Sequence, residues 1–200
     1  MIKNIIFDFG DVFINLNKTD WQKGLQSIGI ASWTTEINSI NDLYEKGLCS
    51  EEDFLSEIQK IGTSKSLEET KDIWCTILGD FPSHRLEFLE QISPKYRLFL
   101  LSNTDAIHIA HFRKTVGEEF FSRFINTFEK AYFSYEMGLR KPQPEIYTQV
   151  ILENDLNPAE TLFVDDKKEN TDAAQQLGIL TWNLQVGKED VVDLFNKTAF

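Results

Sequence analysis

The sequence predicts an α/β fold, a Rossmann-like parallel sheet core with a helical bundle inserted after the first strand. Three observations predict it. Several apolar, strand-like runs each end in a short charged turn. Residues from about 17 to 79 show helical periodicity and no convincing strand, and this stretch is too long for an ordinary connection. After it, strand and helix patterns alternate, which is typical of βαβ units.

The first strand is predicted over Lys3 to Phe7, an apolar run with β-branched residues that is followed by Gly10. Roughly four helices are predicted in the inserted segment. Ser50 precedes three acids, and Ser66 precedes Glu69 by three residues, which is the spacing of a capping box. Three glycines fall where these helices should end, at Gly47, Gly62 and Gly79.

The remaining elements follow from the same reasoning. Strands are predicted over 96–101, near the end of 125–133, over 161–164 and over 179–182. Helices are predicted over 84–92, from about 105, over 144–154, over 168–177 and from 188. Pro144 suits the first turn of its helix, and Gly178 suits the end of another.

Length and composition restrict the class of protein. Two hundred residues with 42% hydrophobic content fit one globular domain, or one domain with an insertion. A net charge of −12 and the lack of a Lys/Arg-rich run argue against nucleic acid as a partner. No apolar stretch is long enough for a signal peptide or a membrane span, and Cys49 and Cys75 are isolated. We therefore expect a cytoplasmic protein that binds a small molecule, with monomer and dimer both open.

Four charged turns follow strand-like runs or lie between predicted elements. The turns are IIFDFGDV with Asp8, LFLLSNTD with Ser102 and Asn103, GLRKPQPEIY with Lys141, and TLFVDDKKEN with Asp165 and Asp166. The carboxyl ends of parallel strands share one edge of a sheet, so these side chains should meet there. Converging carboxylates repel one another, and Mg²⁺ relieves that repulsion. A carboxylate beside the metal is also a possible nucleophile.

These four turns, in this order, resemble the haloacid dehalogenase superfamily of Mg²⁺-dependent phosphohydrolases. The resemblance extends from Ile5 to about Trp182. It is similar to the branch with FD-x-G-x-V, SNT and MGLRKP, which includes α-D-glucose-1-phosphate phosphatases. The resemblance implies a catalytic core of residues 1–16 and 80–200, and a helical cap of residues 17–79 that closes over the active site.

The resemblance also implies roles for individual residues. Asp8 would be the nucleophile that forms an aspartyl-phosphate, although an acid at a strand end also often caps a loop or helix. Asp8, the Gly10 carbonyl, Asp166 and Asp165 would hold Mg²⁺, and Asn170 would orient those metal ligands.

Three further residues would bind the substrate phosphate. Ser102 and Asn103 would hydrogen-bond phosphoryl oxygens, although an SNTD turn also suits an ordinary helix cap. Lys141 would hold the phosphate charge and keep Asp8 ionised, although most lysines lie on the surface.

Gly10 departs from the pattern of the superfamily, which usually has an aspartate there as general acid and base. A glycine offers its carbonyl to a metal but cannot protonate a leaving group. A sugar 1-phosphate has a comparatively acidic leaving group, which fits this branch. Asp11 is an alternative proton donor, but successive residues of an extended turn point in different directions.

Other side chains have weaker claims. His108 and His111 have a spacing that suits zinc, yet no third ligand is evident, and packing is the simpler interpretation. Glu45 and Lys46 in YEKGLCSEEDF are specificity candidates by resemblance. The cap residues Trp21, Trp33, Tyr44 and Trp74 are mainly packing candidates.

The sequence thus predicts a Mg²⁺-dependent phosphatase that acts on a small phosphorylated metabolite, with α-D-glucose 1-phosphate as the leading substrate. Two alternatives remain at this point. One is a metal-independent haloacid dehalogenase, which the Asp165–Asp166 pair disfavours. The other is a catalytically silent binder of a phosphorylated ligand, which Gly10 keeps open.

Overall fold

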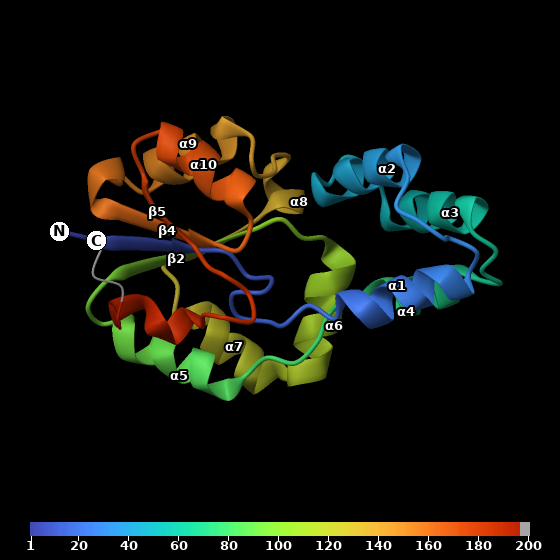
Figure 1. The fold of residues 1–200 in the computed structure, drawn as a ribbon, viewed down its shortest axis with the longest axis horizontal. Coiled ribbons are helices and arrows are strands. Elements are labelled where there is room, and N and C mark those ends of the chain that lie inside the picture. The colour runs from blue at the N-terminus through green and yellow to red at the C-terminus, as the bar shows by residue number, and fades with distance from the viewer. Residues whose placement is uncertain (197–200) are drawn as a thin grey trace.

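A computed structural model describes residues 1–196 and shows a five-stranded parallel sheet between layers of helices (Figure 1). The strand order is β3-β2-β1-β4-β5. The strands are β1 (Asn4–Phe7), β2 (Arg97–Ser102), β3 (Lys130–Phe133), β4 (Thr161–Asp165) and β5 (Leu180–Asn183). The predicted α/β class is confirmed. The order changes direction at β1, which is the usual position of a ligand site in such sheets.

Both faces of the sheet are buried, as is usual for parallel strands. In β1, Ile5 and Phe7 pack on one face and Ile6 packs on the other, because successive side chains alternate. The first face is covered by α5 (Ser83–Ile92), α7 (Glu118–Asn126) and the 3₁₀ helix Val191–Asn196. The second face is covered by α9 (Pro144–Glu153) and α10 (Lys168–Gln176) (Figure 1).

The inserted segment forms four helices beyond one end of the sheet, drawn in blue to cyan in Figure 1. They are α1 (Lys18–Ser27), α2 (Thr35–Glu45), α3 (Glu51–Ile61) and α4 (Leu67–Cys75). They share a hydrophobic core of their own, which Ile107 of α6 (Ala106–Val116) joins from outside the segment. The predicted caps Ser50 and Ser66 each accept a hydrogen bond from a first-turn amide.

The two connections to this four-helix unit run side by side. Leu16 and Leu78 form an antiparallel bridge, and the Gly79 amide donates to the Asn15 carbonyl at 2.8 Å. A Cβ at Gly79 would lie 2.6 Å from the same oxygen. The prediction that Gly79 ends a helix is therefore wrong, because close approach of the two backbones is what requires glycine there.

Three other elements differ from the prediction. The sequence predicted one helix from about residue 105, where the structure has both α6 and α7, and it did not indicate the short α8 (Ser134–Met137). The helix predicted from Lys188 is instead the 3₁₀ helix Val191–Asn196, and residues 197–200 lie outside the described part. Within residues 1–196, none of the helices is long and apolar enough to cross a membrane.

Candidate active site

The predicted site residues lie at the carboxyl ends of the central strands. Asp8 directly follows β1 and its amide donates to the Val164 carbonyl of β4 at 2.9 Å. Asp165 is the last residue of β4, and Ser102 is the last residue of β2. The chain enters β1 from the side marked N in Figure 1, so these ends point toward the four-helix unit.

Lys141 connects two of the acids. It lies in the segment between α8 and α9, is 1% exposed, and donates from Nζ to Asp8 Oδ1 and to Asp165 Oδ2, both at 2.7 Å. Burial lowers the pKa of Lys141, but the charges of Asp165 and Asp8 outweigh it and the pKa is raised overall. Lys141 is therefore a fixed ammonium between two carboxylates, and not the surface lysine that its type alone favours.

Asp165 is held from several directions. Its Oδ1 accepts the Lys167 amide at 2.8 Å, and the Asn170 side-chain amide donates to both carboxylate oxygens at 3.0 Å. The side chain is 0% exposed. Through these contacts, Asp165 fixes both the turn after β4 and the position of the Lys141 ammonium.

The geometry fits a cation among three acids. Carboxylate oxygens of Asp8, Asp165 and Asp166 all lie within 4.8 Å of one another, the single such cluster of potential metal ligands found in residues 1–196. Burial raises the pKa of Asp8 to about 7, and the negative charges of Asp165 and Asp166 add to it against the effect of Lys141. Burial and Asp165 likewise raise the pKa of Asp166. A cation would relieve both effects.

The chemistry of these donors suits Mg²⁺ and not a soft metal. They are all carboxylate oxygens, which hard cations prefer. Asn170 Oδ1 is a buried acceptor without a donor in the described part of the chain, and a metal-bound water is a suitable donor for it.

Asn103 makes contacts that differ from its predicted role. Its Oδ1 accepts the Lys141 amide at 2.9 Å, and its Nδ2 donates to the Lys141 carbonyl at 2.8 Å. Both side-chain groups therefore fix the backbone that carries the lysine. Ser102 is buried at the end of β2.

Gly10 stands where the superfamily usually has its general acid, and Asp11 is the alternative proton donor. Gly10 forms an isolated bridge with Ile14, and a Cβ there would lie 3.2 Å from the Leu16 side chain. Asp11, and not Gly10, has a left-handed backbone conformation, with φ of 56°. The carboxylate of Asp11 accepts the Leu16 amide at 3.0 Å and lies 2.5 Å from Lys18 Nζ. Both oxygens are thus engaged, which makes Asp11 a poor proton donor.

The two histidines do not form a metal site. His108 lies between acceptors, with Nδ1 2.9 Å from Asp105 Oδ2 and Nε2 3.1 Å from the Trp74 carbonyl. The Trp74 indole also donates to Asp105 at 3.0 Å. His111 is exposed. This cluster joins α4 to the start of α6, a packing role that agrees with the simpler interpretation.

The structure places Arg140 against α2. Its guanidinium pairs with Asp42, and its Nη2 lies 2.9 Å from Glu45 Oε2. Lys46, the other specificity candidate, lies 3.4 Å from Asp42. The sequence could have indicated that Arg140 lies near the site, because it immediately precedes Lys141.

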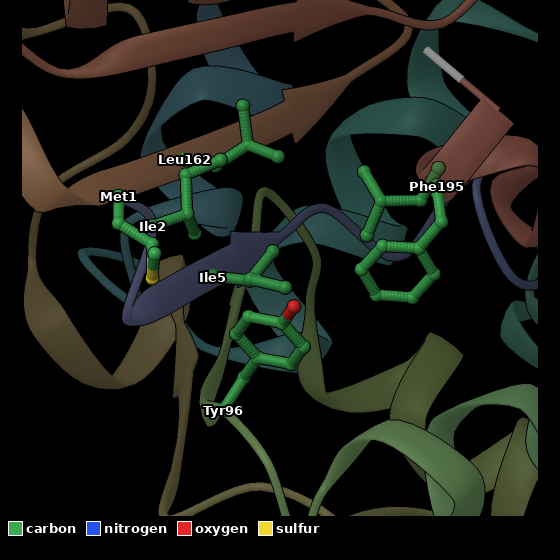
Figure 2. Close-up of a pocket in the computed structure, with 7 residues that line it drawn as sticks. Met1, Ile2, Ile5, Tyr96, Leu162 and Phe195 are labelled. Atoms are coloured by element: carbon green, nitrogen blue, oxygen red, sulfur yellow. The ribbon is translucent and has the colours of Figure 1, made fainter. Parts of the chain in front are cut away.

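A separate pocket lies at the opposite edge of the sheet. It is lined by Met1, Ile2, Ile5, Tyr96, Leu162, Leu194 and Phe195, and Figure 2 shows it at the start of β1. Its lining is apolar and holds none of the acids, so it has no part in the chemistry of the acid cluster.

Comparisons with known proteins agree with this geometry. Residues 2–178 match the family described as haloacid dehalogenase-like hydrolase. The chain is 29% identical to the D-ribitol-5-phosphate phosphatase of Bacteroides thetaiotaomicron, covering 94% of this chain and 95% of that protein. It is 30% identical to a sesquiterpene phosphatase of Aspergillus oryzae, covering 91% of this chain and 89% of that protein.

One solved structure is similar over the whole chain. It is a mutant enzyme of the same family from Bacteroides thetaiotaomicron, in complex with magnesium and inorganic phosphate. The TM-score is 0.89 at 33% sequence identity, and the match covers 98% of this chain and 100% of the other.

Proposed function

This chain belongs to the haloacid dehalogenase-like hydrolases and is a phosphatase, and we propose that it hydrolyses a small phosphorylated sugar or polyol with the help of Mg²⁺. The observation that carries the proposal is the contact of Lys141 with Asp8 and Asp165, beside Asp166. Three acids and one buried ammonium form a site for a cation and a phosphoryl group.

In the proposed mechanism, Asp8 Oδ2 attacks phosphorus, the bond from phosphorus to the substrate oxygen breaks, and the departing alkoxide takes a proton from water as the aspartyl-phosphate forms. Water then attacks the phosphorus of this acyl phosphate, which releases inorganic phosphate, returns a proton to solvent and restores the Asp8 carboxylate. Lys141 holds Oδ1 of Asp8, which keeps the carboxylate ionised and aims its other oxygen. Bound Mg²⁺ supplies positive charge that neutralises the phosphoryl oxygens.

The metal would be held by Asp8, Asp166 and the Gly10 carbonyl. Asp165 already accepts bonds from Lys141, Lys167 and Asn170, so we assign it chiefly to positioning. Asn103 is assigned the same way, through the backbone of Lys141, and Ser102 remains a proposed phosphate ligand.

The substrate class rests on two supports. One relative is a phosphatase of D-ribitol 5-phosphate, a linear polyol phosphate. The other is Gly10, which supplies no acid and so favours the hemiacetal leaving group of α-D-glucose 1-phosphate over a primary ester such as D-ribitol 5-phosphate. The glucose ester stays a prediction of the sequence.

We also propose that α1–α4 act as the cap over this site, with residues 1–16 and 80–200 as the catalytic core. Support comes from their place beyond the carboxyl edge of the sheet and from their separate hydrophobic core (Figure 1). A lid of this kind excludes water during the reaction. A cytoplasmic location is part of the same proposal, supported by the free thiols of Cys49 and Cys75.

A screen of phosphorylated metabolites with and without Mg²⁺ tests the function. We expect phosphate release that EDTA abolishes and that Asp8→Asn lacks. Release of chloride from 2-chloropropionate, unaffected by EDTA, would instead identify a dehalogenase. Binding of phosphorylated ligands without turnover of any of them would indicate a silent binder.

A further inference from the structure

One face of α2 carries polar side chains although it is buried. Asn41, Tyr44 and Glu45 are spaced by three and four residues, so they lie on the same side of the helix. Asn41 is 8% exposed and the Glu45 side chain is 18% exposed. A helix face buried only for packing would normally carry apolar residues there.

This face is turned toward the proposed active site. Arg140 contacts both Asp42 and Glu45 of α2, and it directly precedes Lys141, whose ammonium holds Asp8. The last turn of α2 therefore lies beside the segment that supplies the catalytic lysine.

The charged groups near Glu45 also indicate that it lies close to the proposed active site. Burial raises its pKa against a side-chain contact with Asn41, and the nearby charged groups belong to Lys167, Asp105 and His108. Lys167 follows Asp166 after β4, and Asp105 and His108 begin the helix that follows β2. Together with its 2.9 Å contact to Arg140 Nη2, these neighbours place Glu45 close to the segments that follow two strands of the sheet.

Several polar atoms at this place have no hydrogen-bond partner. Buried side-chain atoms without a hydrogen bond in residues 1–196 include three at this place, which are Asn41 Oδ1, Glu45 Oε2 and Arg140 Nε, whereas the Tyr44 hydroxyl lies against the Ile107 backbone. Arg140 Nη2 lies close to Glu45 Oε2 but makes no hydrogen bond with it. Buried polar atoms are nearly always paired, so a set of unpaired ones calls for an explanation.

We propose that Asn41 and Glu45, together with Arg140 Nε, form a subsite that binds hydroxyl groups of the substrate. Each hydroxyl both donates and accepts, so neighbouring hydroxyls satisfy two acceptors and one donor at once. This assignment rests on the proposed function, and it makes a phosphorylated polyol or sugar the substrate class.

An apolar ester is the rival occupant, since one relative is a sesquiterpene phosphatase. The tryptophans Trp21, Trp33 and Trp74 pack together in the same four-helix unit and would suit such a tail. An apolar chain against Asn41 and Glu45 would leave their oxygens buried and unpaired, which disfavours binding. The unpaired atoms therefore favour the polyol.

The test compares two substrates of equal chain length, D-ribitol 5-phosphate and n-pentyl phosphate. We expect the wild type to prefer the polyol ester in kcat/KM by about 100-fold, because a site built for hydroxyls rejects the analogue that lacks them. Asn41→Leu and Glu45→Gln should each reduce that preference by about 10-fold, the effect of one hydrogen bond, chiefly through a lower kcat/KM for the polyol ester.

Matched controls lie on the exposed side of the same helix. Asn38→Leu and Glu36→Gln repeat the two substitutions at exposed positions and should leave the preference unchanged. Thermal melts establish that each variant is folded, and Glu45→Gln, which keeps its size, carries the test if Asn41→Leu does not fold.

Turnover of p-nitrophenyl phosphate separates this inference from the proposed function. If the wild type does not hydrolyse it with Mg²⁺, the function itself fails. If it does, but pentyl or farnesyl phosphate is cleaved as fast as ribitol 5-phosphate, the hydroxyl subsite is wrong. An unchanged preference in folded Asn41→Leu and Glu45→Gln would overturn it as well.

Discussion

The carboxyl edge of the sheet and the buried face of α2 differ in how their polar atoms are satisfied. At the edge, Lys141 bonds to Asp8 and Asp165, and Asp165 accepts three further hydrogen bonds. On α2, Asn41 Oδ1 is buried without a donor, and Glu45 Oε2 lies 2.9 Å from Arg140 Nη2 but accepts no hydrogen bond. This difference is what we expect if the proposed reacting groups are fixed before substrate arrives and the proposed recognition groups complete their contacts with it.

The largest expected effect comes from removing the nucleophile. Asp8→Asn keeps the size of the side chain but loses its charge, and we expect kcat/KM for p-nitrophenyl phosphate to fall by about 10⁴-fold or more. Steady-state kinetics measure the loss, and circular dichroism shows whether the fold is retained. Residual activity above about 1% of wild type would rule out covalent catalysis by Asp8.

The next effect is on stability, at the paired edge. Asp165→Asn removes one of two counter-charges of a buried ammonium, and we expect a loss of about 3 kcal/mol in the free energy of unfolding. Urea unfolding without added metal measures it. Asp172→Asn is the control, because the Lys168–Asp172 pair is exposed and should contribute less than about 0.5 kcal/mol. Equal losses in both variants would show that burial does not govern the pair.

The next prediction concerns Gly10, which stands at the usual position of the general acid. Without an acid there, kcat for glucose 1-phosphate should exceed kcat for glucose 6-phosphate by about 10-fold or more. Gly10→Asp should reduce the difference. The backbone at Gly10 does not need a positive φ, so the obstacle to the new side chain is Leu16, which lies 3.2 Å from the position that a Cβ would take. Equal kcat values, with chemistry rate-limiting, would contradict the leaving-group argument.

A smaller effect concerns the contact that joins α4 to α6. Both ring nitrogens of His108 face acceptors, so the ring is held as the cation, with Asp105 and Glu45 as the nearby acids and His111 as the nearby base. Burial lowers the pKa of His108, but Asp105 raises it above the ordinary 6.5 overall.

Because the folded-state pKa is the higher one, this stabilisation is complete below the ordinary value and is lost as pH rises through the folded-state pKa. The wild type should therefore exceed His108→Gln in stability by about 1 kcal/mol at about pH 6, and the margin should shrink toward about pH 9. Thermal melts across this range measure it. A margin that grows with pH would mean that the ring is neutral.

The smallest expected effect is on the stability of α2. Asn41→Leu removes an acceptor that has no partner but also the side-chain contact with Glu45, so the free energy of unfolding should fall by no more than about 1 kcal/mol. Urea unfolding measures this too. A loss of more than about 2 kcal/mol would show that Asn41 supports the fold, and the contrast between the two regions would then disappear.

Several features could be predicted from local sequence because local physics decides them. The alternation of apolar runs and helical patterns predicted the parallel sheet and the four inserted helices, and Ser50 and Ser66 cap helices as their first-turn partners indicated. The four charged turns predicted which residues would gather at the sheet edge, and the structure brings Asp8, Lys141, Asp165 and Asp166 together there. Their catalytic roles remain proposals.

Other features depended on neighbours far away in the chain. Gly79 looks like a helix end but is required by the backbone of Asn15, and Arg140 looks exposed but is paired with Asp42 of α2. Asn103 bonds to the backbone of Lys141 through both of its side-chain groups, a contact that its place in the SNTD turn does not indicate. Periodicity and residue type carry no information about such partners, because these contacts form only when distant segments pack. The sequence by itself therefore determined the class of fold and which residues gather at the sheet edge, whereas the tertiary structure decided which polar atoms are paired and which, on α2, are left open.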